Sequence, residues 1–572
     1  MNRREFTETV LTVDDAAHHP LPERSPDEFA NRALPTGLQR SAAGLEPYTG
    51  TWGTEQMLHL LRRTTIGVRI GDLQSIKNKS LAETVGLLLT EPPIPAPPVN
   101  NYSTVADTSG VLPGATWVNA PYSSANNGSR ILSWKAWWIS QMISQQLSIR
   151  EKMTLFWHNH FATETANIDT ARNVYNHNAL LRQFALGNFK ELTKRITIDP
   201  AMLRYLNGYA NTKTAPDENY GRELQELFTV GKGPDSHFTE DDVKNAARVL
   251  TGWRINSAND TSYFDSTRHD TGDKTFSAFY NNAVITGSTV AATGLLELNA
   301  LLDMIFTQQE TAKFLARKLY RFFVYYVIDA GVETNVIVPL AEIIRSNNYE
   351  IKPALSALFS SAHFFDPVNM GCVIKSPIDL TVGLCREFSI DAVSTVTPPA
   401  VLTDSQKYGI WDYIRSQSSS LQMNIGDPPN VAGWSPYYQE PQFYEIWINA
   451  DTLPKRNQFT DTMIATTGYT KSSTRLVIDV LAYATQFSDP SDPTTLVNDI
   501  VQHLYAIPIS DSLKASLKTS SLLSGQTSIH YWTDAWNAYR ANPTNSAARS
   551  TVSTRLQTLI KALMNAAEYQ LA

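Results

Sequence analysis

The chain has 572 residues, of which 42% are hydrophobic and 18% are charged. This length suffices for a large core, and the composition excludes an intrinsically disordered chain. The net charge of −7 is spread without basic blocks, so we expect no nucleic-acid partner and no polybasic membrane contact.

The cysteines and the first residues bear on the compartment. Only Cys372 and Cys385 are present, which excludes a disulfide framework; one bridge between them is an option, but two structural thiols are favoured. The start, "MNRREF", is similar to a twin-arginine export signal, but Asp14 and Asp15 interrupt the apolar segment that such a signal needs. No other window approaches the ~18 apolar residues of a membrane span. We therefore expect a soluble, cytoplasmic chain without a transmembrane segment.

The first part of the chain divides into an arm, a helix and a loop. Residues 1–45 are polar and aperiodic, which indicates an N-terminal arm. A helical pattern begins at Thr54, which we expect to be its cap. The proline-rich stretch 91–103 predicts a linker or a long surface loop.

Helix signals are frequent beyond Gly128. "DPAMLRYLNG" has Asp199 in the capping position, and "TEDDVKNAARVLTG" begins a second capped helix at Thr239. Thr307 and Glu310 have the spacing of a capping box, which predicts that the next helix begins there.

These patterns predict a mainly α fold, a large multi-helix domain with long irregular loops. We place the helical core domain at 46–395, with a loop insertion near 255–300 that has room for a short β-hairpin. An irregular segment, 396–460, contains "PPNVAGW", and a C-terminal helical extension covers 461–572.

The stretch "FWHNHF" (156–161) places two histidines among large apolar side chains. On a helical wheel the apolar residues around it fall on every side, which predicts a buried helix. His158 and His160 then point roughly 200° apart, so they cannot both ligate one metal ion from a straight helix. We expect a carboxylate partner for each ring, Glu151 for His158 and Glu164 for His160. Two satisfied core histidines and a functional site are about equally supported.

The stretch "DENYGRELQELF" (217–228) predicts an amphipathic helix. Its polar stripe holds Asn219, Arg222, Glu223 and Glu226. A solvated face is the simpler interpretation. The alternative is a Glu223–Glu226 pair that binds a metal ion or shares a proton beside Arg222, with Glu218 able to join.

A third candidate is "RHDTGDK" (268–274), which lies in the loop insertion. His269 and Asp270 offer a donor and an acceptor on a loop, where catalytic groups are often found. The signal is weak because Asp, Thr and Gly also form ordinary turns. No nucleophile-elbow, phosphate-binding or zinc-protease motif is present.

Taken together, these stretches resemble a bacterial family known as domain of unknown function number 1800. The similar strings, which cover roughly residues 50–460, are "HLLRRTTIG" (59–67), "REKMTLFWHNHF" (150–161), "DPAMLRYLNG" (199–208), "ENYGRELQELFTVG" (218–231), "FTEDDVKNAARVLTGW" (238–253), "HDTGDKTF" (269–276), "KSPIDLTVG" (375–383) and "PPNVAGW" (428–434). The resemblance implies no reaction, but it places the candidate residues within the family's own strings. Members often begin with an export signal, which makes the periplasm the alternative location.

We expect a metal-dependent enzyme, a hydrolase or an oxidoreductase, with Zn, Mn or Fe as the cofactor. The expected catalytic residues are His158, His160, Arg222, Glu226, His269 and Asp270, and the expected metal ligands are His158, His160, Glu223 and Glu226. Two alternatives stay open. One is a metal-free acid–base enzyme whose arginine binds an anionic substrate, and the other is a non-enzymatic scaffold or assembly subunit with a buried polar network.

Overall fold

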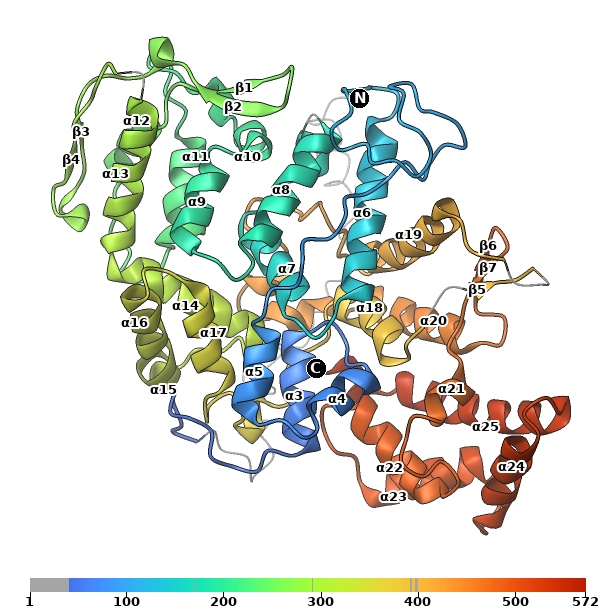
Figure 1. Ribbon diagram of the computed structural model, residues 1–572. Helices are drawn as coiled ribbons and strands as arrows, with labels where there is room; N and C mark the ends of the chain where they lie inside the picture. Colours follow the sequence, from blue (N-terminus) through green and yellow to red (C-terminus); the bar gives the residue numbers. More distant parts are fainter. Residues whose placement is uncertain (1–40, 169, 291, 391–392, 397–399) are drawn as a thin grey trace, which may run out of the picture. The chain divides into compact units, whose positions relative to one another are not determined.

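The computed structural model describes residues 41–168, 170–290, 292–390, 393–396 and 400–572 (Figure 1). From Ala42 to Ala572 the chain packs as one compact unit. It is mainly α-helical with a few short hairpins, as the sequence predicts. The predicted arm at 1–45 and the twin-arginine-like start fall almost wholly outside the described residues.

The N-terminal half of the unit is built from helices, and the predicted proline-rich loop at 91–103 lies in the long irregular connection between the third and fourth of them. The helices are α3 (Thr54–Thr64), α4 (Ile70–Ile76), α5 (Leu81–Leu88), α6 (Asn127–Ser144), α7 (Arg150–His160), α8 (Ala171–Gln183), α9 (Phe189–Thr197), α10 (Pro200–Tyr205), α11 (Glu218–Glu223) and α12 (Glu240–Val249). Asp199 and Thr239 cap α10 and α12 as predicted. The predicted cap at Thr54 is wrong, because Gly53 holds the capping position of α3 and the side chain of Gln56 accepts from its N–H.

The loop insertion contains two antiparallel hairpins. β1 (Trp253–Asn256) pairs with β2 (Thr261–Phe264), with Trp253 opposite Phe264, and β3 (Lys274–Thr275) pairs with β4 (Val284–Ile285). The insertion is shorter than predicted because helix α13 already begins at Thr293.

The rest of the unit is again helical. The helices are α13 (Thr293–Thr307), α14 (Gln309–Phe323), α15 (Ala330–Val332), α16 (Val338–Ser346), α17 (Ile351–Phe359), α18 (Pro377–Glu387), α19 (Asp404–Ser420), α20 (Thr452–Ile464), α21 (Val480–Ala484), α22 (Pro493–Leu504), α23 (Asp511–Leu517), α24 (His530–Ala541) and α25 (Ser546–Met564). β5 (Val393–Ser394), β7 (Thr474–Leu476) and β6 (Tyr469–Lys471) form a small sheet in that order. The predicted Thr307–Glu310 capping box is wrong, because Thr307 ends α13 and its hydroxyl donates to the carbonyl of Met304.

Short 3₁₀-helical segments occur in the loops, and the π-helical segments η3, η6 and η10 directly continue α-helices. All of these segments are η1 (Thr165–Asn167), η2 (Gly208–Ala210), η3 (Leu224–Thr229), η4 (Ser266–Arg268), η5 (Ala278–Tyr280), η6 (Glu333–Ile337), η7 (Pro367–Asn369), η8 (Ser435–Tyr437), η9 (Phe443–Trp447), η10 (Lys518–Leu522) and η11 (Ala567–Gln570). The predicted irregular segment at 396–460 holds η8 and η9, although α19 and the start of α20 also fall within it.

Two hydrophobic clusters form the core. The first holds side chains of α3, α7, α9 and α13 to α17, and the second joins α6, α18 and α19 to the C-terminal helices. The predicted domain boundaries at 395 and 460 stay predictions. Helices α20 and α25 pack on each other, and both contribute side chains to the second cluster.

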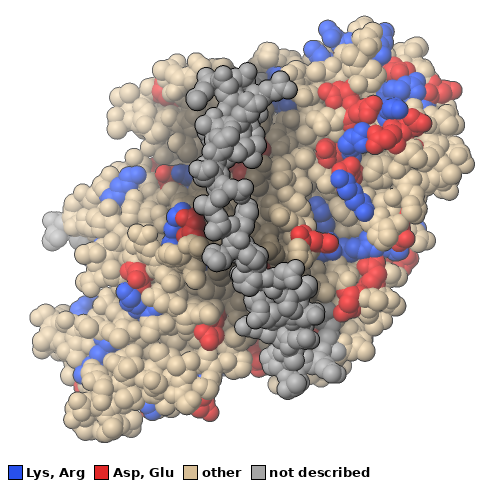
Figure 2. All heavy atoms as spheres, turned by 180° about the vertical axis from the view of Figure 1, so that it is seen from behind, with Lys and Arg blue, Asp and Glu red and all other residues tan. Residues whose placement is uncertain are grey.

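Three further observations concern the surface, the helices and the cysteines. Acidic and basic side chains are interspersed on the face drawn in Figure 2. No helix in the described part of the chain is both long and apolar enough to span a bilayer. Cys372 and Cys385 are not joined by a disulfide, and burial raises the pKa of Cys385 to about 12.

Candidate functional site

Helix α7 carries both candidate histidines into the core. The side chains of His158 and His160 are buried, and the apolar residues of α7 are buried on all its sides. The His158 ring lies edge-on to Trp138, whereas the His160 ring packs among phenylalanines that include Phe161 and Phe189. The two rings therefore face different parts of the core, as the helical geometry predicts.

Main-chain hydrogen bonds hold the two rings in opposite neutral tautomers. The N–H of Gly426 donates to Nε2 of His158 at 3.1 Å, so the His158 proton is on Nδ1. Nε2 of His160 donates to the carbonyl of Phe228 at 3.0 Å, so the His160 proton is on Nε2. Burial lowers the pKa of His158 to about 3 and lowers the pKa of His160 well below its usual value. Both rings are neutral at pH 7.

The predicted carboxylate partners lie elsewhere. Glu151 accepts two hydrogen bonds from Arg182, at 2.9 and 3.0 Å, and Glu164 accepts one from Asn167 at 2.8 Å. The pairing of Glu151 with His158 and of Glu164 with His160 is therefore wrong. Loop and π-turn main chain from more than 60 residues away in sequence reaches the rings, and that is invisible to a helical wheel.

Asn159, between the two histidines, binds the same distant loop. Its Oδ1 accepts a hydrogen bond from the N–H of Trp434 at 2.8 Å. The preceding Gly433 has φ +93°, and a Cβ at this position would overlap Asn159, so only glycine fits. Together with the bond from Gly426 to His158, this contact docks segment 424–434 on α7. The "FWHNHF" stretch thus binds the "PPNVAGW" stretch.

The polar stripe of 217–228 is divided by a change of helix type. α11 passes at Leu224 into the π-helical turn η3, a feature often found at functional sites. Arg222 donates to Glu240 at 2.6 and 2.7 Å and to Glu218 at 3.3 Å, and Asn219 is exposed. Arg222 is therefore held at the surface by acidic side chains.

Glu223 and Glu226 are close enough to influence each other. Glu226 pairs with Lys232, whereas Oε2 of Glu223 is buried without a hydrogen-bond partner. Burial and the charge of Glu226 raise the pKa of Glu223. Glu223 and Glu226 are thus the carboxylate pair that the sequence predicts, but the predicted histidine ligands are not beside them.

His269 and Asp270 belong to a buried network that anchors the hairpins. Nε2 of His269 donates to Glu297 at 3.0 Å, and Nζ of Lys274 donates to the other oxygen of Glu297 at 2.6 Å. Asp270 accepts from Arg248 at 2.7 and 3.2 Å. Burial raises the pKa of Glu297, but the bonds from His269 and Lys274 outweigh it and the net pKa is lowered.

The structure does not bring the predicted metal ligands into one shell. His158 and His160 diverge, and each offers Nε2 to main chain, while Glu223 and Glu226 lie on α11 and η3. Across the described ranges, no group of three or more His, Cys, Asp or Glu is arranged to hold a metal ion.

A small pocket lies where other family-like strings meet, and we call it the Lys152 pocket. Its polar lining residues are Arg63 on α3, Lys152 on α7, Arg321 on α14, Ser376 and Asp379 at the start of α18, and Tyr437 in η8. Aromatic walls come from Phe322, Tyr326, Phe443, Tyr444 and Trp447. The cavity volume is about 30 Å³, room for about two waters at ~10–15 Å³ each.

The centre of the Lys152 pocket is an ion pair. Nζ of Lys152 lies 2.5 Å from Oδ1 of Asp379, and Oδ2 of Asp379 accepts from the hydroxyl of Ser376 at 2.8 Å. Burial lowers the pKa of Lys152, although Asp379 opposes the shift. Burial also raises the pKa of Tyr437, so this phenol keeps its proton next to Ser376 and Asp379.

Two arginines add positive charge to the Lys152 pocket. Arg63 donates from Nε and Nη2 to the carbonyls of Phe323 and Phe322, at 2.9 and 3.1 Å, which leaves Nη1 unbonded among the described residues. Arg321 lies over the ring of Phe443, 3.8 Å from the exposed Glu440. The lining therefore has three cations and one carboxylate.

The comparison with known families agrees with the motifs that meet here. A family described as "Protein of unknown function (DUF1800)" matches residues 59–571. The chain belongs to this family. No curated protein and no solved structure matches it.

The DUF1800 match confirms the resemblance and corrects its extent. The strings found in the sequence end near residue 460, whereas the match continues to 571 and includes the C-terminal helices. The physical reason is the shared second cluster, in which α25 packs with α20 and η10.

Sequence reasoning missed the polar residues of the Lys152 pocket. Arg63, Lys152, Ser376 and Asp379 all lie within DUF1800-like strings, each a polar group in a mostly apolar stretch. The same criterion singled out His158 and His160, so the signal was available. Which of these groups share a pocket depends on contacts between α3, α7 and α18, which no local pattern contains.

Proposed function

We propose that the chain is a metal-free acid–base enzyme that takes a small substrate with a carboxylate or phosphate group into the Lys152 pocket. One observation carries the proposal. Three cations, one carboxylate and a neutral phenol, drawn from three of the DUF1800-like strings and from α14 and η8, line a single pocket. A positive excess in a largely enclosed space favours a small anion.

The roles follow from the charges and from the free hydrogen-bonding positions. Arg63 Nη1 and Arg321 would hold the anionic group of the substrate, since guanidinium groups pair well with carboxylate and phosphate. The Lys152 ammonium, whose pKa is lowered by burial, would donate a proton to the adjoining substrate atom, and Asp379 would hold the ammonium in position. Tyr437 would donate a hydrogen bond to negative charge that develops there.

Calorimetric titration of the full chain with phosphate and, separately, with acetate tests the anion site, with sodium chloride at matched ionic strength as the blank. We expect saturable binding of at least one anion. Arg321→Gln should weaken it at least tenfold, about 1.4 kcal/mol, because Arg321 lies at the pocket rim.

Arg345→Gln is the matched control, because Arg345 is a similarly exposed arginine on α16 that pairs with Glu342 at 3.7 Å. Its affinity should equal that of the wild type. Absence of saturable binding for both anions, or equal loss in the two variants, would contradict the proposal and favour the scaffold alternative.

A metal-dependent reaction is a second candidate, and one observation favours it. Oε2 of Glu223 is buried without a partner beside Glu226, and a bound cation would satisfy it. Zn, Mn or Fe at this pair would need water or substrate oxygens to complete its shell. Elemental analysis of the purified chain tests this candidate: metal that is lost in Glu223→Gln supports it, and equal metal content in both proteins contradicts it.

A further inference from the structure

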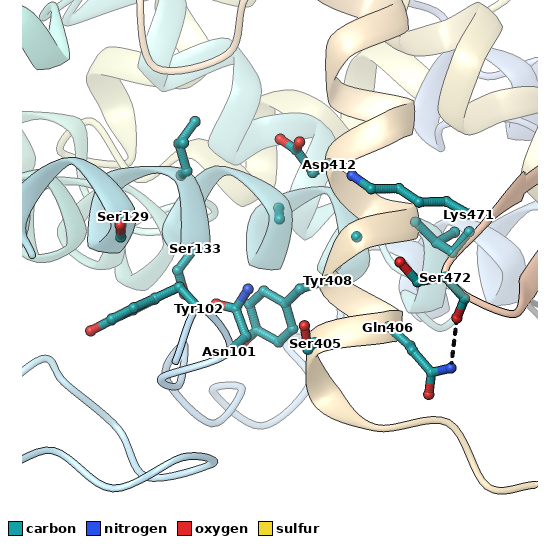
Figure 3. A pocket seen from close by; sticks show the side chains of 14 residues that line it. Asn101, Tyr102, Ser129, Ser133, Ser405, Gln406, Tyr408, Asp412, Lys471 and Ser472 are labelled. Carbon is teal, nitrogen blue, oxygen red and sulfur yellow. Dashed lines mark hydrogen bonds between the residues drawn. The ribbon is translucent and has the colours of Figure 1, made fainter. Parts of the chain in front are cut away.

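A second pocket, separate from the Lys152 pocket, lies between α6 and α19, and we call it the α6–α19 pocket. Ser129, Leu132 and Ser133 line it from α6 (Figure 3). The lining residues from α19 are Ser405, Gln406, Tyr408, Gly409, Ile410 and Asp412. Residues of the β6–β7 turn close one side. Its cavity volume is about 290 Å³, near the lower end of the ~300–1,000 Å³ typical of small-molecule sites. It shares no lining residue with the Lys152 pocket.

A missing side chain creates the space. Gly409 lies within α19, and a Cβ built on it would meet no atom within 4 Å. A glycine inside a helix lowers helix stability relative to alanine, so this position is unfavourable for the isolated helix. The open floor beside Gly409 is apolar, formed by Ala136 and by Leu132, which is 51% exposed.

Hydrogen-bonding groups, neutral except for the Lys471 ammonium and the Asp412 carboxylate, surround this apolar floor. Oδ1 of Asn101 is buried with no hydrogen-bond partner. The hydroxyls of Ser129 and Ser405 and the ammonium of Lys471 also have no partner among the described residues. Figure 3 shows the Lys471 side chain reaching across α19 toward Asp412. These groups are free to bind a ligand.

The charges of the α6–α19 pocket nearly cancel, which distinguishes it from the Lys152 pocket. Asp412 is held by Arg415 at 2.6 Å, and Lys471 is the one cation among the lining residues. The ring of Tyr102 adds an aromatic surface. Amide and hydroxyl groups around an apolar and aromatic floor match a molecule that has hydroxyls at its edge and C–H groups on its faces.

We propose that the α6–α19 pocket binds one or two rings of a neutral carbohydrate. Its hydroxyls would bond to Asn101, Ser129, Ser405 and Lys471, and a sugar face would lie on Leu132 and in the space beside Gly409. The site is a binding site outside the Lys152 pocket, so its occupancy does not depend on the reaction proposed there.

A glycan array of neutral mono- and disaccharides, probed with the full chain, tests the proposal. We expect the wild type to bind at least one of these sugars, and Gly409→Leu to lose at least tenfold in affinity because the new side chain fills the pocket. Gly86→Leu is the matched control, since Gly86 is also a helical glycine whose Cβ would meet nothing within 4 Å. It should bind as the wild type does.

Folding is checked by circular dichroism, and both leucine variants should unfold at or above the wild-type temperature, since each replaces a helical glycine. An array without any bound sugar would overturn the proposal. So would a sugar whose affinity is unchanged by Gly409→Leu. The free amino acid glycine is titrated as a zwitterionic probe. Binding of this amino acid by the wild type that is lost in Gly409→Leu would assign the pocket to a zwitterionic ligand and would likewise overturn the proposal.

Discussion

Hydrogen bonds to main-chain groups determine which ring nitrogen carries the proton in His158 and in His160. One ring accepts from the N–H of Gly426 and the other donates to the carbonyl of Phe228, so two histidines in one hexapeptide carry their protons on different nitrogens. Protonation of His158 would remove the acceptor of Gly426 and bury a charge. Burial lowers the pKa of both rings, and the bond from His160 to Phe228 opposes part of that shift.

The lowered pKa values predict a pH dependence of stability. An unfolded histidine gains a proton as the pH falls below about 6.5, whereas folded His158 gains one only near pH 3. Between these two pH values each such group lowers the free energy of unfolding by about 1.4 kcal/mol per pH unit. We expect the free energy of unfolding in urea to fall from pH 7 to pH 5. In His158→Gln, which keeps an acceptor for Gly426, the fall should be about 2 kcal/mol smaller.

His530→Gln is the control, because His530 is exposed on α24 and should leave the fall unchanged. A fall in His158→Gln that equals the wild-type fall would show that folded His158 titrates like a solvated ring.

Segment 424–434 is the element that links "FWHNHF" to the Lys152 pocket. Gly426 and Trp434 bind α7 through His158 and Asn159. The segments η8 and η9, which follow, supply Tyr437 and three of the five aromatic wall residues. The docking therefore positions one side of the pocket. His158 and Asn159 thus act on the Lys152 pocket indirectly, through the loop that they bind.

Gly433→Ala tests this docking. The substitution places a Cβ at φ +93° and against the Oδ1 and carbonyl of Asn159, so we expect a loss of more than about 3 kcal/mol in the free energy of unfolding. Gly110→Ala is the matched control, because Gly110 has φ +86° but nothing within 4 Å of the added Cβ. Gly110→Ala should lose only about 1–2 kcal/mol in the free energy of unfolding. Denaturant titration measures both variants, and an equal loss in the two would contradict the role of the Asn159 contact.

At the scale of the whole unit, the C-terminus braces the approach to α18. The N–H of Lys375 donates to the carbonyl of Gln570 at 2.7 Å, and the hydroxyl of Tyr569 donates to Glu387 at 2.7 Å. Lys375 also pairs with Glu387 at 3.1 Å. The last residues thus hold the segment that carries Ser376 and Asp379 into the Lys152 pocket.

Tyr569→Phe should lower the free energy of unfolding by about 1–3 kcal/mol, because a buried carboxylate loses a donor. Tyr531→Phe is the control, since Tyr531 is 42% exposed, and it should change stability by less than about 0.5 kcal/mol. Denaturant titration of the two variants measures both values. Equal stability of the two variants would show that the C-terminus does not brace this segment.

Local patterns in the sequence determined the mainly α class, the buried character of α7, the caps of α10 and α12 and the opposite directions of His158 and His160. Capping and periodicity act within one or two helical turns, so a single stretch of chain contains them. Only the tertiary structure decided that Gly426, Phe228 and Trp434 bind the "FWHNHF" stretch. It also decided that Arg63, Lys152 and Asp379 share one pocket, because these partners are tens to hundreds of residues apart and meet only through packing of the core.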